Sequence, residues 1–381
     1  MSGKSGIYEE LGVRRVINAR GHPTVIGGNT PSATVRAAME EADEDFVDLG
    51  DLIDAVSGRV AGMLGIEAAL VTPGCAAALA LGAAACMTGN DLEKIERVPD
   101  VADMPHEFII QRQLRVSYDR AITIPGGKLV EVGVPGGTRP EHIEAAIGPK
   151  TAGIHYLAGG LYDEPDERKD SVHIADVIDI AHSHDLPVIV DAAGQVYPTD
   201  RLSRYVKMGA DIVCYGAKYF GGVNSSGLLT GKKELVRAAQ SHSFVGFEAD
   251  GIRAFGRVMK MDRQSVVAVY VALKEWLTLN HEDRISAYYP RLSAIRDALA
   301  GVEGIALVDF PDRGLTEGLR IRIDGARASK TAQQVIDELY SGDPRIMVRE
   351  HDEPDSLVIR IQTVNEGDEK IIARRLREIL G

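Results

Sequence analysis

Two side chains stand out as suited to chemistry: an aspartate that ends an apolar run and a lysine in a glycine-flanked turn. Asp191 follows residues 186–190 and precedes Ala192 and Ala193, and Lys218 lies within residues 214–222, Cys-Tyr-Gly-Ala-Lys-Tyr-Phe-Gly-Gly. An acid can pair with a pyridine nitrogen, and a lysine amine can form a Schiff base with an aldehyde. This is how proteins hold pyridoxal phosphate, so the sequence predicts a pyridoxal-phosphate site.

A glycine turn before a helix supplies a third part of the predicted site. Residues 72–76 read Thr-Pro-Gly-Cys-Ala, at the end of a predicted strand. Helix amino termini expose unpaired N–H groups, which can bind a phosphate. Each feature also has a purely structural reading: a tight turn, a capping aspartate or a solvated lysine. The order and spacing of all three favour the functional reading, and small Ala192 and Ala193 leave room for a flat ring.

Composition bounds the class of protein. The chain has 381 residues, 45% hydrophobic and 26% charged, enough for a large core and two or three domains. Its net charge of -13 argues against binding to nucleic acid or to anionic membranes. Cys75, Cys86 and Cys214 fit no zinc spacing, so no metal site is expected. The absence of a signal peptide and of a membrane-spanning stretch favours a cytoplasmic location.

The middle of the chain alternates strand and helix patterns. This order predicts an α/β fold with a mostly parallel sheet covered by helices on both faces. The predicted strands are residues 68–72, 108–110, 128–132, 151–156, 186–190, 211–214 and 226–230, and the predicted helices are 59–64, 75–87 and 174–184.

The carboxyl-terminal part follows a different pattern. A helical stretch at 265–279 leads into it, alternating strands are predicted at 319–323 and 357–361, and helices at 331–340 and 369–380. A smaller α+β domain is therefore expected. The predicted organisation is an amino-terminal segment (1–50) that forms an arm and part of the small domain, a cofactor-binding large domain (51–280) and a carboxyl-terminal small domain (281–381).

With these residues in place, the chain resembles the selenocysteine-synthase-like (SelA-like) branch of fold type I pyridoxal-phosphate enzymes, and within it the ammonia-lyases. The resemblance covers roughly the first 275 residues. It is carried by residues 7–12 (Ile-Tyr-Glu-Glu-Leu-Gly), 16–19 (Val-Ile-Asn-Ala), 191–193 (Asp-Ala-Ala), 216–218 (Gly-Ala-Lys) and 256–260 (Gly-Arg-Val-Met-Lys). It implies a large domain like that of fold type I pyridoxal-phosphate-dependent transferases.

The resemblance also implies roles for single residues. Lys218 would be the cofactor-linked catalytic lysine and carry the proton at the substrate α-carbon, and Asp191 would bind the ring nitrogen. The other implied cofactor-binding residues are Gly74, Cys75, Ala76, Ala193, Tyr215 and Arg257, and the implied substrate-binding residues are Arg112, Tyr118, Arg257 and Lys260. The basic pair Arg257 and Lys260 faces anionic ligands in this group, although surface charge is the alternative reading.

Departures from the family pattern concern the substrate more than the cofactor. Gln195 stands where a glutamate is expected, Leu114 where a histidine is, and His22 where a lysine is. Residues 157–162, Leu-Ala-Gly-Gly-Leu-Tyr, replace polar and basic residues. These losses argue against a sugar phosphate as the substrate. The reaction type is less affected, because the cofactor carries the chemistry.

The predicted activity is a lyase reaction: α-proton removal and β-elimination on an anionic amino acid or amino sugar acid, releasing ammonia and a 2-oxo acid. Racemisation requires a second base on the other face, and aldol cleavage requires a base at a β-hydroxyl. His22, His155 and Tyr118 are the candidates for such a base. A homodimer or larger homo-oligomer is implied, because fold type I sites are built across a subunit interface.

Three other classes remain open. Selenium or sulfur transfer to a tRNA-borne serine would need a basic surface, which a net charge of -13 disfavours. A regulatory protein could bind pyridoxal phosphate without turnover, but the presence of both Lys218 and Asp191 weakly opposes this. A nucleotide-binding module would use Gly74 as its phosphate turn. However, the chain has neither the GxGxxG nor the GxxxxGK[ST] pattern of nucleotide-binding proteins, and this reading would leave the lysine turn unexplained.

Overall fold

The computed structural model describes residues 6–159, 170–311, 316–350 and 353–381, and the predicted departure at 160–162 lies outside them. The chain forms two compact units. The large unit is Pro31–Thr278, and the small unit combines Met1–Thr30 with Leu279–Gly381. The amino-terminal segment 1–50 is therefore divided: its first thirty residues belong to the small unit, and the rest belongs to the large one.

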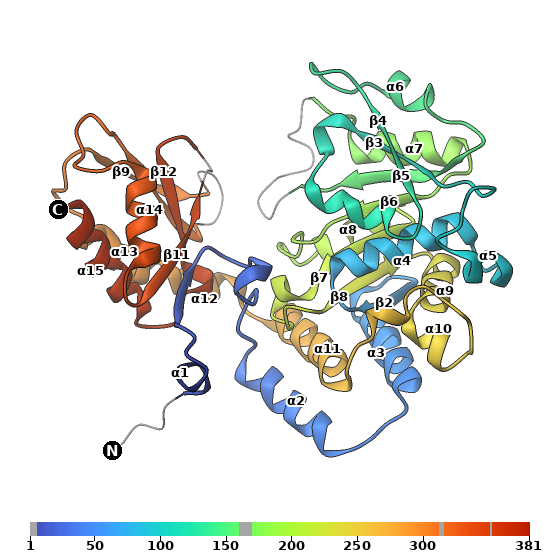
Figure 1. Ribbon diagram of the computed structural model, residues 1–381, viewed down its shortest axis with the longest axis horizontal. Helices are drawn as coiled ribbons and strands as arrows, with labels where there is room; N and C mark the ends of the chain where they lie inside the picture. Colours follow the sequence, from blue (N-terminus) through green and yellow to red (C-terminus); the bar gives the residue numbers. More distant parts are fainter. Residues whose placement is uncertain (1–5, 160–169, 312–315, 351–352) are drawn as a thin grey trace. The chain divides into compact units, whose positions relative to one another are not determined.

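A mixed sheet forms the centre of the large unit (Figure 1). Within the described residues it has seven strands in the order β2-β8-β7-β6-β5-β3-β4, and β8 alone runs against the others. The mostly parallel sheet predicted from the sequence is confirmed. The strands are β2 (Ala68–Thr72), β3 (Glu107–Gln111), β4 (Lys128–Val132), β5 (Thr151–Leu157), β6 (Val188–Asp191), β7 (Ile212–Gly216) and β8 (Gly227–Gly231).

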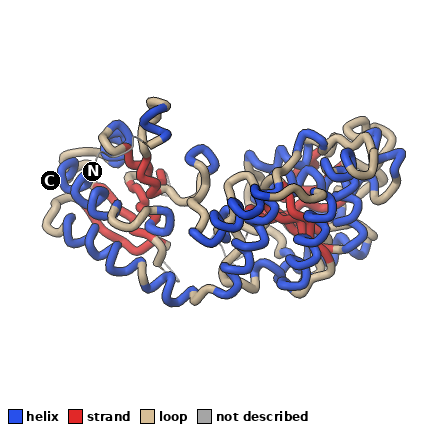
Figure 2. The backbone as a smooth tube through the Cα atoms, turned by 90° about the horizontal axis from the view of Figure 1, so that it is seen from below, coloured by secondary structure: helices blue, strands red, loops and turns tan. Residues whose placement is uncertain are grey.

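Helices surround this sheet, as the tube drawing shows (Figure 2). The central strands β5 to β8 are buried along nearly their whole length, which explains their almost continuous apolar sequences. The helices of the large unit are α2 (Ala33–Glu44), α3 (Leu49–Leu64), α4 (Cys75–Thr88), α5 (Leu92–Arg97), α6 (Pro140–Glu144), α7 (Ile174–Ser183), α8 (Arg201–Met208), α9 (Lys233–His242), α10 (Phe244–Glu248) and α11 (Arg263–Thr278).

Strand direction brings the predicted site residues to one edge of the sheet. Strands β2, β6 and β7 run in the same direction, so their carboxyl ends lie at the same edge. Thr72, Asp191 and Gly216 are the last residues of these strands. Open α/β sheets bind ligands outside the carboxyl ends of their strands.

Helix α4 reaches this edge because a glycine lets it pack closely on the sheet. A β-carbon at Gly82 would lie 2.9 Å from Ile189 Cδ1 and 3.1 Å from Ile212 Cγ2. Ile189 and Ile212 therefore mark the face of the sheet that α4 covers. This face also carries Asp191 and Cys214, since alternate residues of a strand share a face.

We expect Gly82→Ala to destabilise the fold by about 1–3 kcal/mol, because the added methyl group overpacks the contact between α4 and the sheet. Gly62→Ala in α3 is the matched control, since a β-carbon there meets nothing within 4 Å. The control should be neutral or stabilising by up to about 1 kcal/mol. Urea unfolding of both variants measures the difference, and equal midpoints would contradict the close approach of α4.

The small unit is an α+β fold, as predicted. Its five described strands have the order β1-β11-β12-β10-β9, and only the pair β1–β11 is parallel. The strands are β1 (Val16–Ala19), β9 (Ile305–Phe310), β10 (Gly318–Ile323), β11 (Arg345–Glu350) and β12 (Ser356–Arg360). The helices are α1 (Ile7–Glu10), α12 (His281–Ser286), α13 (Tyr288–Ala298), α14 (Ala332–Ser341) and α15 (Asp368–Leu380).

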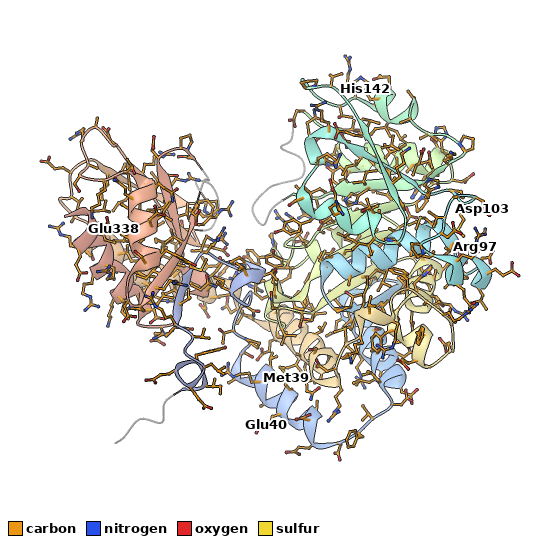
Figure 3. All side chains as sticks on the ribbon, viewed as in Figure 1. Met39, Glu40, Arg97, Asp103, His142 and Glu338 are labelled. Carbon is orange, nitrogen blue, oxygen red and sulfur yellow. The ribbon has the colours of Figure 1, made fainter. Side chains whose placement is uncertain are left out.

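The helical surface of both units is rich in charge. On α2, Met39 packs against the core while the neighbouring Glu40 is exposed, and Glu338 on α14 pairs with Lys330 (Figure 3). Such exposed pairs contribute little to stability, with a median of about 0–1 kcal/mol.

Across the described residues, no helix has both the length and the apolar character needed to cross a membrane.

Candidate active site

Asp191 is a buried carboxylate with one oxygen available to a ligand. It is only 5% exposed, and its Oδ1 accepts hydrogen bonds from the Ala193 amide at 3.0 Å and the Cys75 thiol at 3.5 Å. Within the described chain, Oδ2 accepts none. Burial raises the pKa of Asp191, and the nearby His155, the Ala193 amide and the Cys75 thiol oppose this rise. A positively charged partner at Oδ2 would complete the site electrostatically.

Lys218 lies in a short 3₁₀ helix, η5 (Ala217–Phe220), directly after β7. The turn is fixed at both ends, because the Ala217 amide donates to the Ser226 carbonyl and the Gly222 amide donates to the Ala217 carbonyl. The Lys218 Nζ lies 5.3 Å from the centre of the Tyr219 ring. Desolvation lowers the pKa of Lys218, and Cys75 opposes this in part. A lysine with a lowered pKa is a better nucleophile near neutral pH.

Cys75 is the residue that connects the other two. Its thiol donates to Asp191, and it also interacts electrostatically with Lys218. Burial raises the pKa of Cys75 well above its usual value, so the side chain is a neutral thiol. The main chain adds a further connection, because the Gly216 amide donates to the Ala193 carbonyl at 2.9 Å. The structure thus brings Asp191, Lys218 and Cys75 into one cluster.

The turn before α4 has a conformation that requires glycine. Gly74 has φ 106° and ψ 164°, a region that residues with a side chain rarely adopt. It places the first amides of α4, which lack partners within the helix, next to the Asp191 and Lys218 cluster. Cys75 and Ala76 are the first two residues of the helix. Small side chains at this end leave its amides accessible to a phosphate.

Gly227 on β8 packs directly against this turn. A β-carbon at Gly227 would lie 2.6 Å from the Tyr215 carbonyl oxygen, 2.7 Å from the Gly74 carbonyl carbon and 2.8 Å from the Cys75 nitrogen. All three are main-chain atoms, which cannot rotate away. The absence of a side chain at Gly227 therefore sets the position of the turn.

We expect Gly227→Ala to weaken pyridoxal-phosphate binding by at least about tenfold, equivalent to about 1.4 kcal/mol, because the turn at Gly74 must move. Gly148→Ala is the control, since Gly148 is exposed and a β-carbon there meets nothing within 4 Å. Both apo variants are titrated with pyridoxal phosphate, and the quenching of protein fluorescence gives the affinity of each for the cofactor. Unchanged affinity in Gly227→Ala would show that the turn does not hold the cofactor.

The residues present fit pyridoxal phosphate. Asp191 Oδ2 can accept from a protonated ring nitrogen, Ala192 and Ala193 add little bulk beside it, and Lys218 offers a half-buried amine. The glycine turn and the amides of α4 suit the phosphate. Among the described residues, no group of three or more His, Cys, Asp or Glu side chains could hold a metal ion.

The remaining predicted site residues lie outside this cluster. Tyr215 is on the opposite face of β7 from Cys214, and its hydroxyl donates to the Arg201 carbonyl at 2.9 Å. Its side chain therefore points towards α8 and away from Asp191, and only its main chain borders the site. The predicted role of Tyr215 in cofactor binding therefore stays a prediction, and it could involve only the main chain of this residue.

The basic residues also have other partners in the described chain. Arg257, in the 3₁₀ helix η6 (Arg257–Met259), pairs with Glu248 and lies over the Phe247 ring, and Lys260 is exposed. Arg112 pairs with Glu131 at 3.6 Å, and Tyr118 is 74% exposed. Their predicted substrate roles remain predictions.

Two of the departures have a structural explanation. Gln195 is fully buried and accepts a hydrogen bond from Arg201 at 2.8 Å, and Leu114 is also fully buried. His22 lies in the small unit, with Nδ1 3.2 Å from Gln362 Nε2.

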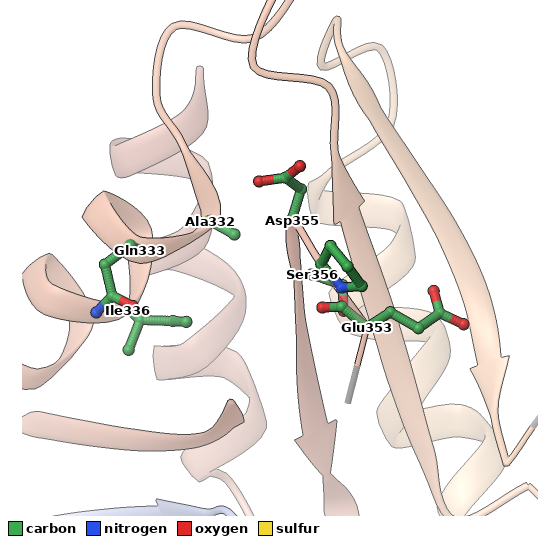
Figure 4. Close-up of a pocket in the computed structure, with 7 residues that line it drawn as sticks. Ala332, Gln333, Ile336, Glu353, Asp355 and Ser356 are labelled. Carbon is green, nitrogen blue, oxygen red and sulfur yellow. The ribbon is translucent and has the colours of Figure 1, made fainter. Parts of the chain in front are cut away.

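A shallow cavity of about 370 Å³ in the small unit offers no chemistry comparable to that of the Lys218 and Asp191 cluster (Figure 4). It is lined by Ala332, Gln333, Ile336, Glu353, Pro354, Asp355 and Ser356.

Sequence reasoning noted Asp119 as a match to the family pattern without giving it a role, and it missed the neighbouring Arg115. His155 on β5 is 1% exposed, and its electrostatic partners are Asp191, Asp119 and Arg115. Asp119, in the 3₁₀ helix η3 (Ser117–Thr123), is also buried and pairs with Arg115. The spacing of Arg115 and Asp119, four residues apart, was the available signal.

The comparisons with known proteins agree with this geometry. The sequence model of the SelA family, described as L-seryl-tRNA selenium transferase, matches residues 31–284. A 5'-C-glycyluridine monooxygenase-decarboxylase from a Streptomyces species is 30% identical, over 98% of this chain and 92% of its own. A D-glucosaminate-6-phosphate ammonia lyase from Salmonella typhimurium is 28% identical, over 98% of this chain and 97% of its own.

A solved structure of D-glucosaminate-6-phosphate ammonia-lyase covers 100% of this chain and 98% of its own, with 28% identity and a TM-score of 0.84. The fold and the site together define a fold type I pyridoxal-phosphate enzyme, which confirms the expected cofactor. More particularly, the chain belongs to the SelA family.

Proposed function

We propose that this enzyme is an ammonia-lyase acting on a small anionic amino acid or amino sugar acid. The observation that carries the proposal is the cluster of Lys218, Asp191 and Cys75 in a chain similar over its full length to an ammonia-lyase. In the net reaction, a β-hydroxy amino acid becomes a 2-oxo acid and ammonia. The water that leaves the β-carbon is balanced by the water that hydrolyses the C–N bond.

The residues divide this work. The bound cofactor supplies an electron sink for charge that develops at the substrate α-carbon. Asp191 holds the proton of the ring nitrogen at Oδ2, while Ala193 and Cys75 hold Oδ1 in place. Lys218 removes the α-proton with its amine, whose pKa is lowered by burial. Cys75, a neutral thiol, orients Asp191 without adding charge.

Recognition of the substrate anion is assigned to the basic residues named from the sequence. Arg112 and Tyr118 are proposed to face the substrate, and Arg257 and Lys260 to meet either a substrate anion or the cofactor phosphate. The family resemblance supports these roles. It also supports the proposal of a homodimer or larger homo-oligomer with sites built across the subunit interface. Light scattering of the holoenzyme tests the assembly, and a monomeric active enzyme would contradict it.

The activity is tested by screening. Holoenzyme is incubated with D- and L-amino acids and amino sugar acids, with and without phosphate groups, and ammonia and 2-oxo acid are measured. Equal release of both products supports the lyase. Racemised substrate without ammonia would support the racemase, and aldehyde release would support aldol cleavage. A cofactor spectrum that no substrate changes would favour a regulatory protein.

A second activity has a specific observation in its favour. The 30%-identical relative is named a monooxygenase-decarboxylase, a type of enzyme that consumes oxygen and releases carbon dioxide. The screen is therefore repeated under nitrogen. Ammonia release that persists without oxygen supports the lyase, whereas oxygen-dependent release of carbon dioxide would replace it with the second activity.

A further inference from the structure

His155 and Asp191 are diagonal neighbours on one face of the sheet. In the parallel pair β5–β6, His155 lies opposite Ile189 and Leu157 lies opposite Asp191. Residues two apart on a strand point to the same side, so the imidazole of His155 and the carboxylate of Asp191 share the face that α4 covers. Their position results from strand register and does not depend on a flexible loop.

One ring nitrogen of His155 is held by the main chain. Nδ1 lies 3.3 Å from the Ile189 carbonyl oxygen. A carbonyl oxygen only accepts, so we assign the Nδ1 hydrogen to this bond. Nε2 is then the nitrogen that can gain or lose a proton, and it makes no hydrogen bond within the described chain.

A second carboxylate, that of Asp119, also interacts electrostatically with His155. Asp119 on η3 is 3% exposed and pairs with Arg115, which also donates to Glu131 at 2.8 Å. The charged groups that face His155 are therefore Asp191, Asp119 and Arg115. Those that face Asp191 are His155, Cys75 and Cys214, and the burial of both thiols keeps them neutral.

Burial acts on the two partners in opposite directions. It raises the pKa of Asp191 and lowers that of His155, while the charge of each opposes the effect on the other. The protonation of each group therefore depends on that of the other. A proton on His155 favours the ionised form of Asp191.

We propose that His155 is a positioning residue for Asp191: held by the Ile189 carbonyl and supported by Asp119, it keeps Asp191 ionised to hold the ring-nitrogen proton. The inference rests on the proposed cofactor site and does not depend on which substrate is used. It places His155 beside the ring nitrogen, away from the α-carbon where a second base would act.

The test is a pH titration of the cofactor's visible absorbance in the holoprotein without substrate. In His155→Phe, the ring nitrogen loses its proton more easily and withdraws less charge from the attached Lys218 nitrogen. The pH midpoint of the absorbance change should therefore rise by about one unit. Cofactor affinity should fall by about tenfold, a loss of about 1.4 kcal/mol. An unchanged midpoint in the folded variant would overturn the proposal.

Two further variants separate this role from packing. His155→Gln keeps a polar side chain that fills the site but cannot take up a proton, so it should shift the midpoint about as much as His155→Phe does. His106→Phe is the matched control, because His106 Nδ1 also contacts a carbonyl, that of Met104, away from the site, and no shift is expected. An unchanged midpoint in His155→Gln, or a shift in the control, would contradict the proposal.

If His155→Phe does not fold, Asp119→Asn replaces it. Removing Asp119 makes a protonated His155 less favourable, so a smaller upward shift of the midpoint is expected. An unchanged midpoint would overturn the inference. Absence of any Lys218-linked absorbance in the unmodified holoprotein would instead refute the cofactor site, which distinguishes the two failures. Loss of lyase activity alone affects neither readout.

Discussion

Lys218→Ala is expected to lose both the covalent link to the cofactor and turnover. The half-buried amine is proposed to hold the cofactor and to move the substrate α-proton, and positioned acid–base groups alone contribute about 10²–10⁴-fold. We therefore expect kcat to fall by at least about 10³-fold. Borohydride reduction followed by peptide mass mapping should find a pyridoxyl adduct on Lys218 in the unmodified protein and none in the variant.

Lys207→Ala is the control for this experiment. Lys207 is an exposed lysine of α8, so its replacement should leave the adduct on Lys218 and the activity unchanged. An adduct on any other lysine of the unmodified protein would refute the assignment of Lys218. Full activity in Lys218→Ala would refute the catalytic role of Lys218, even if the unmodified protein carried the adduct on this residue.

The central sheet could be predicted because its strands are buried on both faces. Runs such as Val188–Asp191 and Gly227–Gly231 are apolar or small throughout, a pattern that needs no knowledge of distant partners. Helix α3 was predicted only from residue 59, although it begins at Leu49. Glycines at 50, 58 and 62 weaken the helical pattern. The Asp48 side chain, which caps the Asp51 amide, was the missed start signal.

The small sheet was harder to predict because its pairing is non-local. Strand β1 pairs with β11 more than three hundred residues later, for example Val16 with Arg345. Neither strand was predicted, and β9 was also missed. Four-residue β1 is too short for a periodic signal, and its pairing partner cannot be inferred from local sequence.

Within the site, the sequence was informative where chemistry depends on residue type and less so where it depends on direction. Lys218 and Asp191 were found because an aspartate that ends an apolar run and a lysine in a glycine-flanked turn are visible in the local sequence. Tyr215 was named from the family resemblance, and strand alternation turns its side chain to the other face. His155 was considered as a second base, and only the β5–β6 register shows that it neighbours Asp191.

Asp191→Asn is expected to reduce kcat by about 10²–10³-fold, the usual loss when a preorganised electrostatic partner is removed. Asparagine keeps an Oδ1 that can accept from the Ala193 amide and the Cys75 thiol, so the fold should be retained. What is lost is the negative charge that holds the ring-nitrogen proton. Steady-state kinetics with the identified substrate measure the loss, and Asp200→Asn, at an exposed aspartate, is the control.

A chemical rescue tests whether charge is the cause. Pyridoxal phosphate methylated at the ring nitrogen carries a permanent positive charge there and needs no acid to keep it. Asp191→Asn reconstituted with this analogue should therefore recover much of the lost kcat, whereas Lys218→Ala should recover none. If the analogue fails to restore activity although it binds, Asp191 acts by orienting the ring rather than by holding its proton. The positioning role of His155 would then lose its physical basis too, because it works only through the charge of Asp191.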